Sequence, residues 1–201
     1  MENDLLYRGG SMIAKMYLDP DTVKELRKTF EKEGSVHLTQ FFEKETYEML
    51  LRMMKKAYYQ RVYEPLRCSY GVQSFHQKAL QQALHEFLCT LLHVKHPLPE
   101  MKMYSFGHRD YTVLQDDVFE KKGILVQFDV TPHWKEEFGG STYLIDKEQD
   151  FLRVLPLANS LVVMKTDSTM KRFVKYVNHT ATNRRRLFLE WFYLDKQENT
   201  H

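Results

Sequence analysis

Two segments in the second half of the chain carry residue types that could bind a metal ion. Gln115 and Asp117 follow the run YTVL (111–114), and His179 follows the run RFVKYV (172–177). Side chains two positions apart on an extended segment point the same way, so Gln115 and Asp117 are expected to share a direction. A carboxylate and an imidazole that converge from two strands can hold a non-haem Fe(II) ion. Such a site leaves coordination positions open for a co-substrate and oxygen.

Three consecutive arginines, Arg184, Arg185 and Arg186, follow His179 at the start of the run RLFLEWFYL (186–194). The fork of a guanidinium group could bind one carboxylate of a dicarboxylic acid through two parallel hydrogen bonds. An arginine run at the start of a strand is more often a solvated edge, and a histidine at a strand end is usually an ordinary polar residue. Residue type and spacing alone therefore leave both interpretations open.

The composition excludes several other kinds of chemistry. The chain has 201 residues, with 29 basic and 27 acidic side chains and a net charge of +2, which gives no general field for nucleic acid or an anionic membrane. Its two cysteines cannot build a disulfide framework or a four-thiolate zinc site. The first residues do not have the pattern of a signal peptide, and no apolar run approaches the roughly 20 residues of a membrane helix. We therefore expect a cytoplasmic protein without nucleic-acid or membrane partners, and its oligomeric state stays open.

The elements that must position the candidate residues change in character along the chain. Asp19 is placed to cap a helix that Gly34 ends. A second helix is expected to begin near Lys44, and a third to cover 75–92. Residues 62–74 contain proline and glycine and predict a loop. The first half of the sequence is therefore predicted to be mainly helical.

The second half has the pattern of strands. Short runs rich in β-branched and aromatic residues are separated by glycine, proline and asparagine turns. The predicted strands are one in the first half and seven in the second: 35–42, 102–107, 111–114, 124–130, 141–145, 160–165, 172–177 and 186–194. This order predicts an α+β fold: a double-stranded β-helix, or jelly roll, with the N-terminal helices packed on one sheet. We expect a single domain over residues 1–201, with a mainly helical support in 1–100 and the jelly-roll core in 101–195.

Four phrases in the second half resemble, in order, the Fe(II)- and 2-oxoglutarate-dependent dioxygenases of the prolyl 4-hydroxylase branch. The phrases are GHRDYTVLQDD, PHWKEEFGG, PLANSLVVM and NHTATNRRRLFLEWFY, and residues 34–60 also resemble the family's N-terminal strand and helix. Within that branch, the sequence is most similar to hydroxylases that modify a prolyl residue of a ribosomal protein. The resemblance implies a jelly roll, Fe(II) and 2-oxoglutarate as cofactors, with ascorbate as an optional addition, and a protein or peptide substrate.

The resemblance also implies residue roles, carried over position by position. His179 matches the distal iron ligand, and Asp117 matches the carboxylate ligand. Arg185 matches the residue that binds the C5 carboxylate of 2-oxoglutarate, because it lies an even number of residues before Trp191 on the same strand face. Tyr104 lies where the family often has a tyrosine near the co-substrate, and an aromatic core residue explains it equally well.

The neighbours of these positions have simpler interpretations. Arg184 and Arg186 are expected to point the other way and to be solvated, although the short segment after His179 leaves the choice among the three arginines open. His108, in the triplet HRD, has the order of the family's His-x-Asp motif. It precedes the YTVL run, so we expect a turn residue there.

The sequence departs from the family at one metal-binding position. Gln115 stands where the family has its first metal histidine, and an amide oxygen is a weaker ligand for Fe(II) than imidazole. The resemblance predicts a dioxygenase that hydroxylates a protein or peptide side chain, prolyl by implication, with Gln115, Asp117 and His179 at the metal. The alternative is a catalytically impaired pseudo-dioxygenase that serves as a protein-binding scaffold. A third hypothesis is a cupin-type small-ligand-binding protein without oxygen chemistry.

Overall fold

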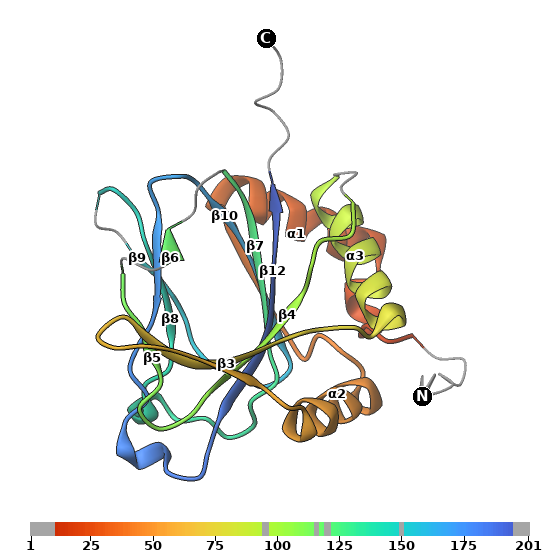
Figure 1. Cartoon of the computed structure of the whole chain (residues 1–201). Helices are drawn as coiled ribbons and strands as arrows, with labels where there is room; N and C mark the ends of the chain where they lie inside the picture. Colours follow the sequence, from red (N-terminus) through yellow and green to blue (C-terminus); the bar gives the residue numbers. More distant parts are fainter. Residues whose placement is uncertain (1–10, 94–96, 115–116, 119–121, 149–150, 195–201) are drawn as a thin grey trace.

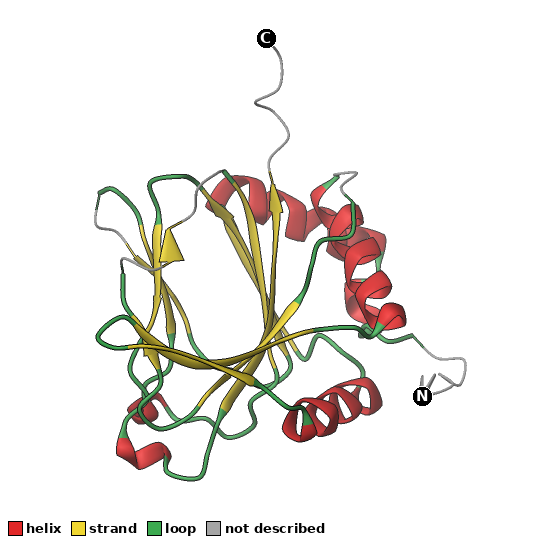
Figure 2. Cartoon of the chain, viewed as in Figure 1, coloured by secondary structure: helices red, strands yellow, loops and turns green. Residues whose placement is uncertain are grey.

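Two β-sheets face each other, and the helices cover the outer side of the larger one (Figures 1 and 2). The residues that the computed structural model describes are 11–93, 97–114, 117–118, 122–148 and 151–194. The candidate ligand Gln115 lies outside these residues. Asp117 lies within them, but only its backbone is described.

Three α-helices lie in the first half of the chain, as predicted. They are α1 (Pro20–Glu33), α2 (Lys44–Lys56) and α3 (Lys78–Leu92), and the short 3-10 helices are η1 (Lys15–Tyr17), η2 (Glu136–Phe138) and η3 (His179–Ala181). The predicted ends of α1 are confirmed: Asp19 Oδ2 accepts a hydrogen bond from the Thr22 N–H at 2.8 Å, and Gly34 has a φ of 74°. None of the helices in the described ranges is long and apolar enough to cross a membrane.

The strands form two antiparallel sheets. Those of the first half are β1 (Ser35–Thr39), β2 (Gln60–Glu64) and β3 (Cys68–Ser74). Those of the second half are β4 (Lys102–Phe106), β5 (Tyr111–Thr112), β6 (Asp117–Val118), β7 (Gly123–Asp129), β8 (Thr142–Ile145), β9 (Phe151–Val154), β10 (Ser160–Thr166), β11 (Lys171–Val174) and β12 (Arg186–Leu194). The large sheet has the order β1-β10-β7-β12-β4-β3-β2, with β5 beside β3, and the small sheet has the order β6-β11-β8-β9. The predicted jelly roll is thereby confirmed, while the single-domain organisation stays a prediction.

The prediction of a loop over 62–74 is wrong, because this segment is most of the β2–β3 hairpin. Pro65 lies in the turn between the two strands, whereas Gly71 lies inside β3. A Cβ atom at Gly71 would lie 2.8 Å from the Cβ of Tyr59. The glycine is therefore explained by the close approach of the Tyr59 side chain to β3, and such an approach is a common reason for glycine within a sheet.

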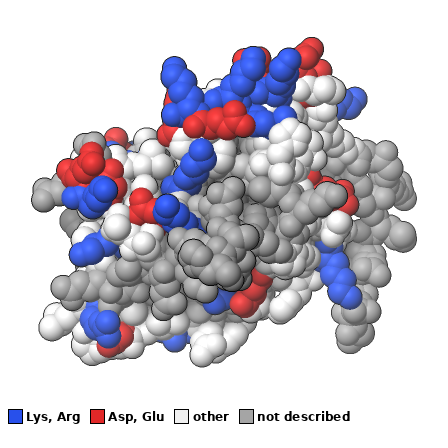
Figure 3. All heavy atoms as spheres, turned by 90° about the horizontal axis from the view of Figure 1, so that it is seen from above, with Lys and Arg blue, Asp and Glu red and all other residues white. Residues whose placement is uncertain are grey.

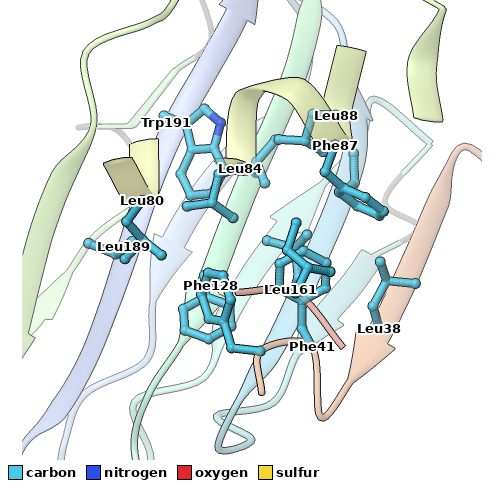
Figure 4. Close-up of a cluster of buried hydrophobic side chains, with 14 of the residues drawn as sticks. Leu38, Phe41, Leu80, Leu84, Phe87, Leu88, Phe128, Leu161, Leu189 and Trp191 are labelled. Atoms are coloured by element: carbon cyan, nitrogen blue, oxygen red, sulfur yellow. The ribbon is translucent and has the colours of Figure 1, made fainter. Parts of the chain in front are cut away.

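The largest cluster of buried apolar residues lies between the helices and the large sheet (Figure 4). From β12 it includes Leu187, Leu189 and Trp191, which pack with α3 residues such as Leu84 and Leu88. Because side chains alternate along a strand, the other residues of β12 face the small sheet. Both faces of this strand are buried.

Two smaller apolar clusters fill the space between the two sheets, which we call the interior of the jelly roll. One contains Phe106, Phe138, Val174, Val177, Ala181 and Phe188. The other contains Leu125, Leu144, Val154, Val162 and Met164. On the outer surface, the face shown in Figure 3 carries basic and acidic side chains next to each other. Charges of one sign are therefore not gathered into one patch on that face.

Candidate functional site

Arg186 is the one member of the arginine run that points into the interior. Its side chain is fully buried, whereas Arg184 and Arg185 are exposed. Arg186 Nε donates to Asp129 Oδ2 at 2.7 Å, and its Nη1 donates to the Thr142 hydroxyl at 2.8 Å and to the Gly140 carbonyl. The prediction that Arg186 is solvated is therefore wrong, and the same prediction for Arg184 is confirmed.

The Asp129–Arg186 pair is held in a strongly desolvated place. Burial raises the pKa of the Asp129 carboxyl, although Arg186 and the hydrogen bonds from Thr131 oppose that shift. Burial also lowers the pKa of the Arg186 guanidinium, and Asp129 opposes it. Each charge thus compensates the other in an environment that would otherwise strongly disfavour it.

A second ion pair joins the two sheets across the interior. Arg172, on β11 of the small sheet, lies 2.7 Å from Glu190, on β12 of the large sheet, measured from Nη2 to Oε2. Beside it, the Thr142 hydroxyl donates to Gln127 Oε1 at 3.0 Å. One of these two interior ion pairs therefore lies within the large sheet, and the other joins the two sheets.

The predicted metal site stays a prediction, because Gln115 and the side chain of Asp117 lie outside the described residues. The backbone of Asp117 in β6 is paired in register with Arg172 in β11. His179 is exposed and lies in η3, seven positions after Arg172 and beyond the end of β11. Val174, the C-terminal residue of β11, is fully buried. Across the residues that the structure describes, no three His, Cys, Asp or Glu side chains could hold a metal ion together.

Arg185 and Tyr104 lie on opposite faces of the large sheet. Arg185 precedes Leu187 by two positions and so shares the outer, helix-side face with Trp191, as the even spacing implied. That face is not the interior, where a dicarboxylate clamp would have to act. Tyr104 is half-buried in the interior, where its ring stacks on Phe188 with centroids 5.1 Å apart.

The environment of Arg186 does not fit a binding site for 2-oxoglutarate. A dicarboxylate that approached Arg186 would meet the carboxylate of Asp129, which already neutralises the guanidinium. Two buried donors, Arg186 Nη2 and Gln127 Nε2, lack a partner among the described atoms. They suit a small neutral acceptor such as water better than a dianion.

Sequence reasoning missed Asp129, Arg172 and Glu190 as interior residues. The missed signal is a charged side chain within an otherwise apolar strand, as in ILVQFDV for Asp129 and RLFLEWFYL for Glu190. A charged residue at such a place must be paired if it is buried, so each of these runs predicts an ion pair.

Comparison with known proteins shows what this sequence and this fold are similar to. Residues 10–74 match a family model described as "Oxoglutarate and iron-dependent oxygenase degradation C-term". Prolyl 3-hydroxylase OGFOD1 from Xenopus laevis is 35% identical over 88 residues, which cover 41% of this chain and 17% of that protein. The corresponding protein from Mus musculus is 32% identical over 92 residues, which cover 44% of this chain and 16% of that protein. This chain thus spans about a sixth of the length of the curated relatives that it matches.

Solved structures of prolyl hydroxylases have the same fold. A Pseudomonas putida prolyl-4-hydroxylase superimposes with a TM-score of 0.68 at 14% identity, covering 86% of this chain and 99% of that one. A Trichoplax adhaerens prolyl hydroxylase, solved in complex with a peptide of hypoxia inducible factor, also gives 0.68, at 11% identity, covering 90% of this chain and 94% of that one. The resemblance to 2-oxoglutarate- and iron-dependent oxygenases of the prolyl hydroxylase kind is confirmed.

Proposed function

We propose that this chain is a prolyl-hydroxylase-like jelly roll that binds a protein or peptide partner without hydroxylating it. The observation that carries the proposal is the pairing of Arg186 with Asp129 in the interior. A working site would need a free guanidinium for 2-oxoglutarate, and here that cation has an internal carboxylate partner.

The relatives favour polypeptides as the class of partner. The curated relatives are named prolyl 3-hydroxylases, and one structural neighbour was solved with a peptide bound. The matching family model is described as a C-terminal region of an oxygenase. A fold that accommodates a peptide in its relatives can retain that use when the reaction is lost.

Hydroxylation of a prolyl side chain is the second candidate function. It is favoured by the identity of 35% to a named prolyl 3-hydroxylase and by the carboxylate residue at position 117, on a strand beside β11. If it holds, Fe(II) would supply oxygen activation and 2-oxoglutarate the electrons. Gln115 and the side chain of Asp117 lie outside the described residues, so we derive no catalytic step from them.

The two candidates are separated by a turnover measurement. Succinate formed from 2-oxoglutarate would be measured with Fe(II), ascorbate and oxygen present, using the Xenopus hydroxylase as the positive control. We expect no succinate above the protein-free background. Turnover that exceeds the background and disappears in Asp117→Ala would contradict the proposal and establish the oxygenase.

A further inference from the structure

The outer edge of β9, the last strand of the small sheet, exposes apolar side chains. In the order β6-β11-β8-β9, this edge pairs with no strand in the part of the chain that is described. Phe151 and Leu152 are 66% and 39% exposed, and they lie on opposite faces of the sheet because side chains alternate along a strand. Leu155 and Leu157, just beyond β9, are also exposed. The three α-helices lie away from this edge, on the outer side of the large sheet (Figure 1).

An exposed apolar edge of this kind is suited to pairing with a further strand. The unpaired N–H and C=O groups of an edge strand are a template for such pairing, and natural proteins often oppose it with charged side chains. For example, β2, at the end of the large sheet, carries Arg61 and Glu64. The one charged residue of β9 is Arg153, which forms an ion pair with Glu136. Since backbone groups and apolar side chains are offered together, we expect an extended polypeptide at this edge.

The outer face of the small sheet has rows of side chains that run across its strands and end on β9. One row consists of Phe173, Tyr143 and Arg153, which are paired in register. The first two rings stack with centroids 4.9 Å apart, and the guanidinium carbon of Arg153 lies 5.7 Å from the centre of the Tyr143 ring. In the next row, Phe151 is paired with Ile145. At the edge, one row therefore ends in a cation and the other in an aromatic ring.

These rows specify the side chains of a strand that would extend the small sheet. An aromatic ring is the favourable neighbour of Arg153, and a cation is the favourable neighbour of Phe151. On the inner face, an apolar side chain is the favourable neighbour of Leu152. The strand pairs described in this sheet are antiparallel, and the first of the three residues in an antiparallel strand would lie opposite Arg153. Read along its own chain, the added strand should therefore be aromatic, apolar and cationic.

β9 itself has this sequence, Phe151-Leu152-Arg153. A second copy, related by a twofold axis at Leu152, would place each Phe151 opposite the Arg153 of the other copy and the two Leu152 side chains opposite each other. Each copy thus offers the same surface that it binds, which is the property of an isologous twofold interface. The two arginines would not lie directly opposite each other, so this register avoids the cross-strand repulsion of like charges. The chemistry of the edge therefore favours a second copy of this chain as its partner.

We propose that two copies of this chain pair through their β9 strands, antiparallel and with the twofold axis at Leu152, so that the two small sheets become one continuous sheet. A twofold interface of this kind closes on itself, so the assembly stops at the dimer. The inference does not depend on the proposed function, because Phe151 and Arg153 lie on the outer face of the small sheet and not in the interior.

Sedimentation equilibrium of the full chain over a range of protein concentrations tests the dimer. We expect the average mass to rise from one chain to two and to stop there. Phe151→Arg places two arginines opposite each other in both outer rows, and we expect it to weaken the association by roughly tenfold or more. Tyr63→Arg is the matched control, because Tyr63 is also 66% exposed and lies in β2, at the edge of the large sheet. It should dimerise like the natural protein, and circular dichroism would check that each variant is folded.

A mixture of two variants tests the register of the pairing. Phe151→Arg gives β9 the order Arg-Leu-Arg, and Arg153→Phe gives it the order Phe-Leu-Phe. A mixed antiparallel pair of these strands regains an aromatic ring opposite a cation in both rows. Native mass spectrometry, with Phe151→Arg labelled by ¹⁵N, should therefore detect the mixed dimer at concentrations where Phe151→Arg alone is monomeric.

Several results would overturn the proposal. One is a natural protein that stays monomeric at every concentration, which would leave the edge to a strand of another protein. Another is a dimer that persists in Phe151→Arg, or that Tyr63→Arg weakens as much, because the interface would then lie elsewhere. Masses beyond two chains would contradict a closed twofold interface, and the absence of the mixed dimer would contradict the antiparallel register at Leu152.

Discussion

Arg185 and Arg186 are neighbours in the chain but lie in opposite environments, one exposed and one fully buried. The alternation of β12 could be predicted from the sequence, and the shared face of Arg185 and Trp191 was placed correctly. Which face is the interior could not be predicted, because both faces of β12 are apolar: Phe188 lies on one, Leu187 on the other. Only the position of the second sheet and the helices distinguishes them.

The buried pair gives a stability prediction at this scale. Arg186→Met leaves Asp129 as an unpaired buried carboxylate, and we expect it to lower the free energy of unfolding by about 3–5 kcal/mol. Adding Asp129→Asn should recover part of that loss, since no isolated charge remains. Urea unfolding of Arg186→Met, of Asp129→Asn and of the double variant measures the coupling free energy between the two side chains.

Arg185→Met is the matched control for this cycle. It removes the same group from an exposed position without an ion pair, so we expect a change within about 0.5 kcal/mol. If Arg186→Met costs no more than Arg185→Met, the pair does not hold the interior together.

At the scale of elements, local signals predicted the helices well and the β2–β3 hairpin poorly. The ends of α1 follow from Asp19 and Gly34, which act through hydrogen bonds to nearby backbone. In the sequence Gly71 predicts a loop, because the contact that requires a glycine there comes from Tyr59, twelve positions away. A glycine required by such a contact has no local signature that separates it from a turn glycine.

The close approach at Gly71 predicts an overpacking effect. Gly71→Ala places a Cβ atom 2.8 Å from that of Tyr59, and we expect a loss of about 1–3 kcal/mol in the free energy of unfolding. Gly107→Ala is the comparison, because its nearest neighbours would lie at 3.7 Å, and it should cost less than about 1 kcal/mol. Equal losses in thermal or urea unfolding would show that the contact with Tyr59 is not the cause.

The cap of α1 predicts a dependence of stability on pH. Hydrogen bonds from the Thr22 N–H and hydroxyl lower the pKa of Asp19 in the folded chain. A lowered folded-state pKa means that the contribution is present above the ordinary pKa of aspartate and is lost as the pH falls through the folded value. Asp19→Ala should therefore destabilise the protein at pH 6 and by less at pH 2.5, in urea unfolding at both pH values. A loss that is independent of pH would contradict the role of the charged cap.

At the scale of the whole molecule, the jelly roll could be predicted because several segments resemble one family in the right order. The side-chain contacts of the interior could not be predicted in the same way, because proteins of one fold can have different functional sites. The glutamine at position 115 predicts a changed site, and the structure adds the Asp129–Arg186 pair as a second sign of change. Asp129 and Arg186 lie in strands β7 and β12, where a single side chain can change without altering the fold.

The most direct test of the proposed loss of the reaction is an anaerobic titration of the full chain with Fe(II) in the presence of 2-oxoglutarate. Absorbance would be followed for the charge-transfer band of iron-bound 2-oxoglutarate, with the Xenopus hydroxylase as the positive control. We predict no band, either in the natural protein or in Gln115→His, because Asp129 still neutralises Arg186 and leaves no free guanidinium for 2-oxoglutarate. A band that saturates at one iron per chain in the natural protein would contradict the account.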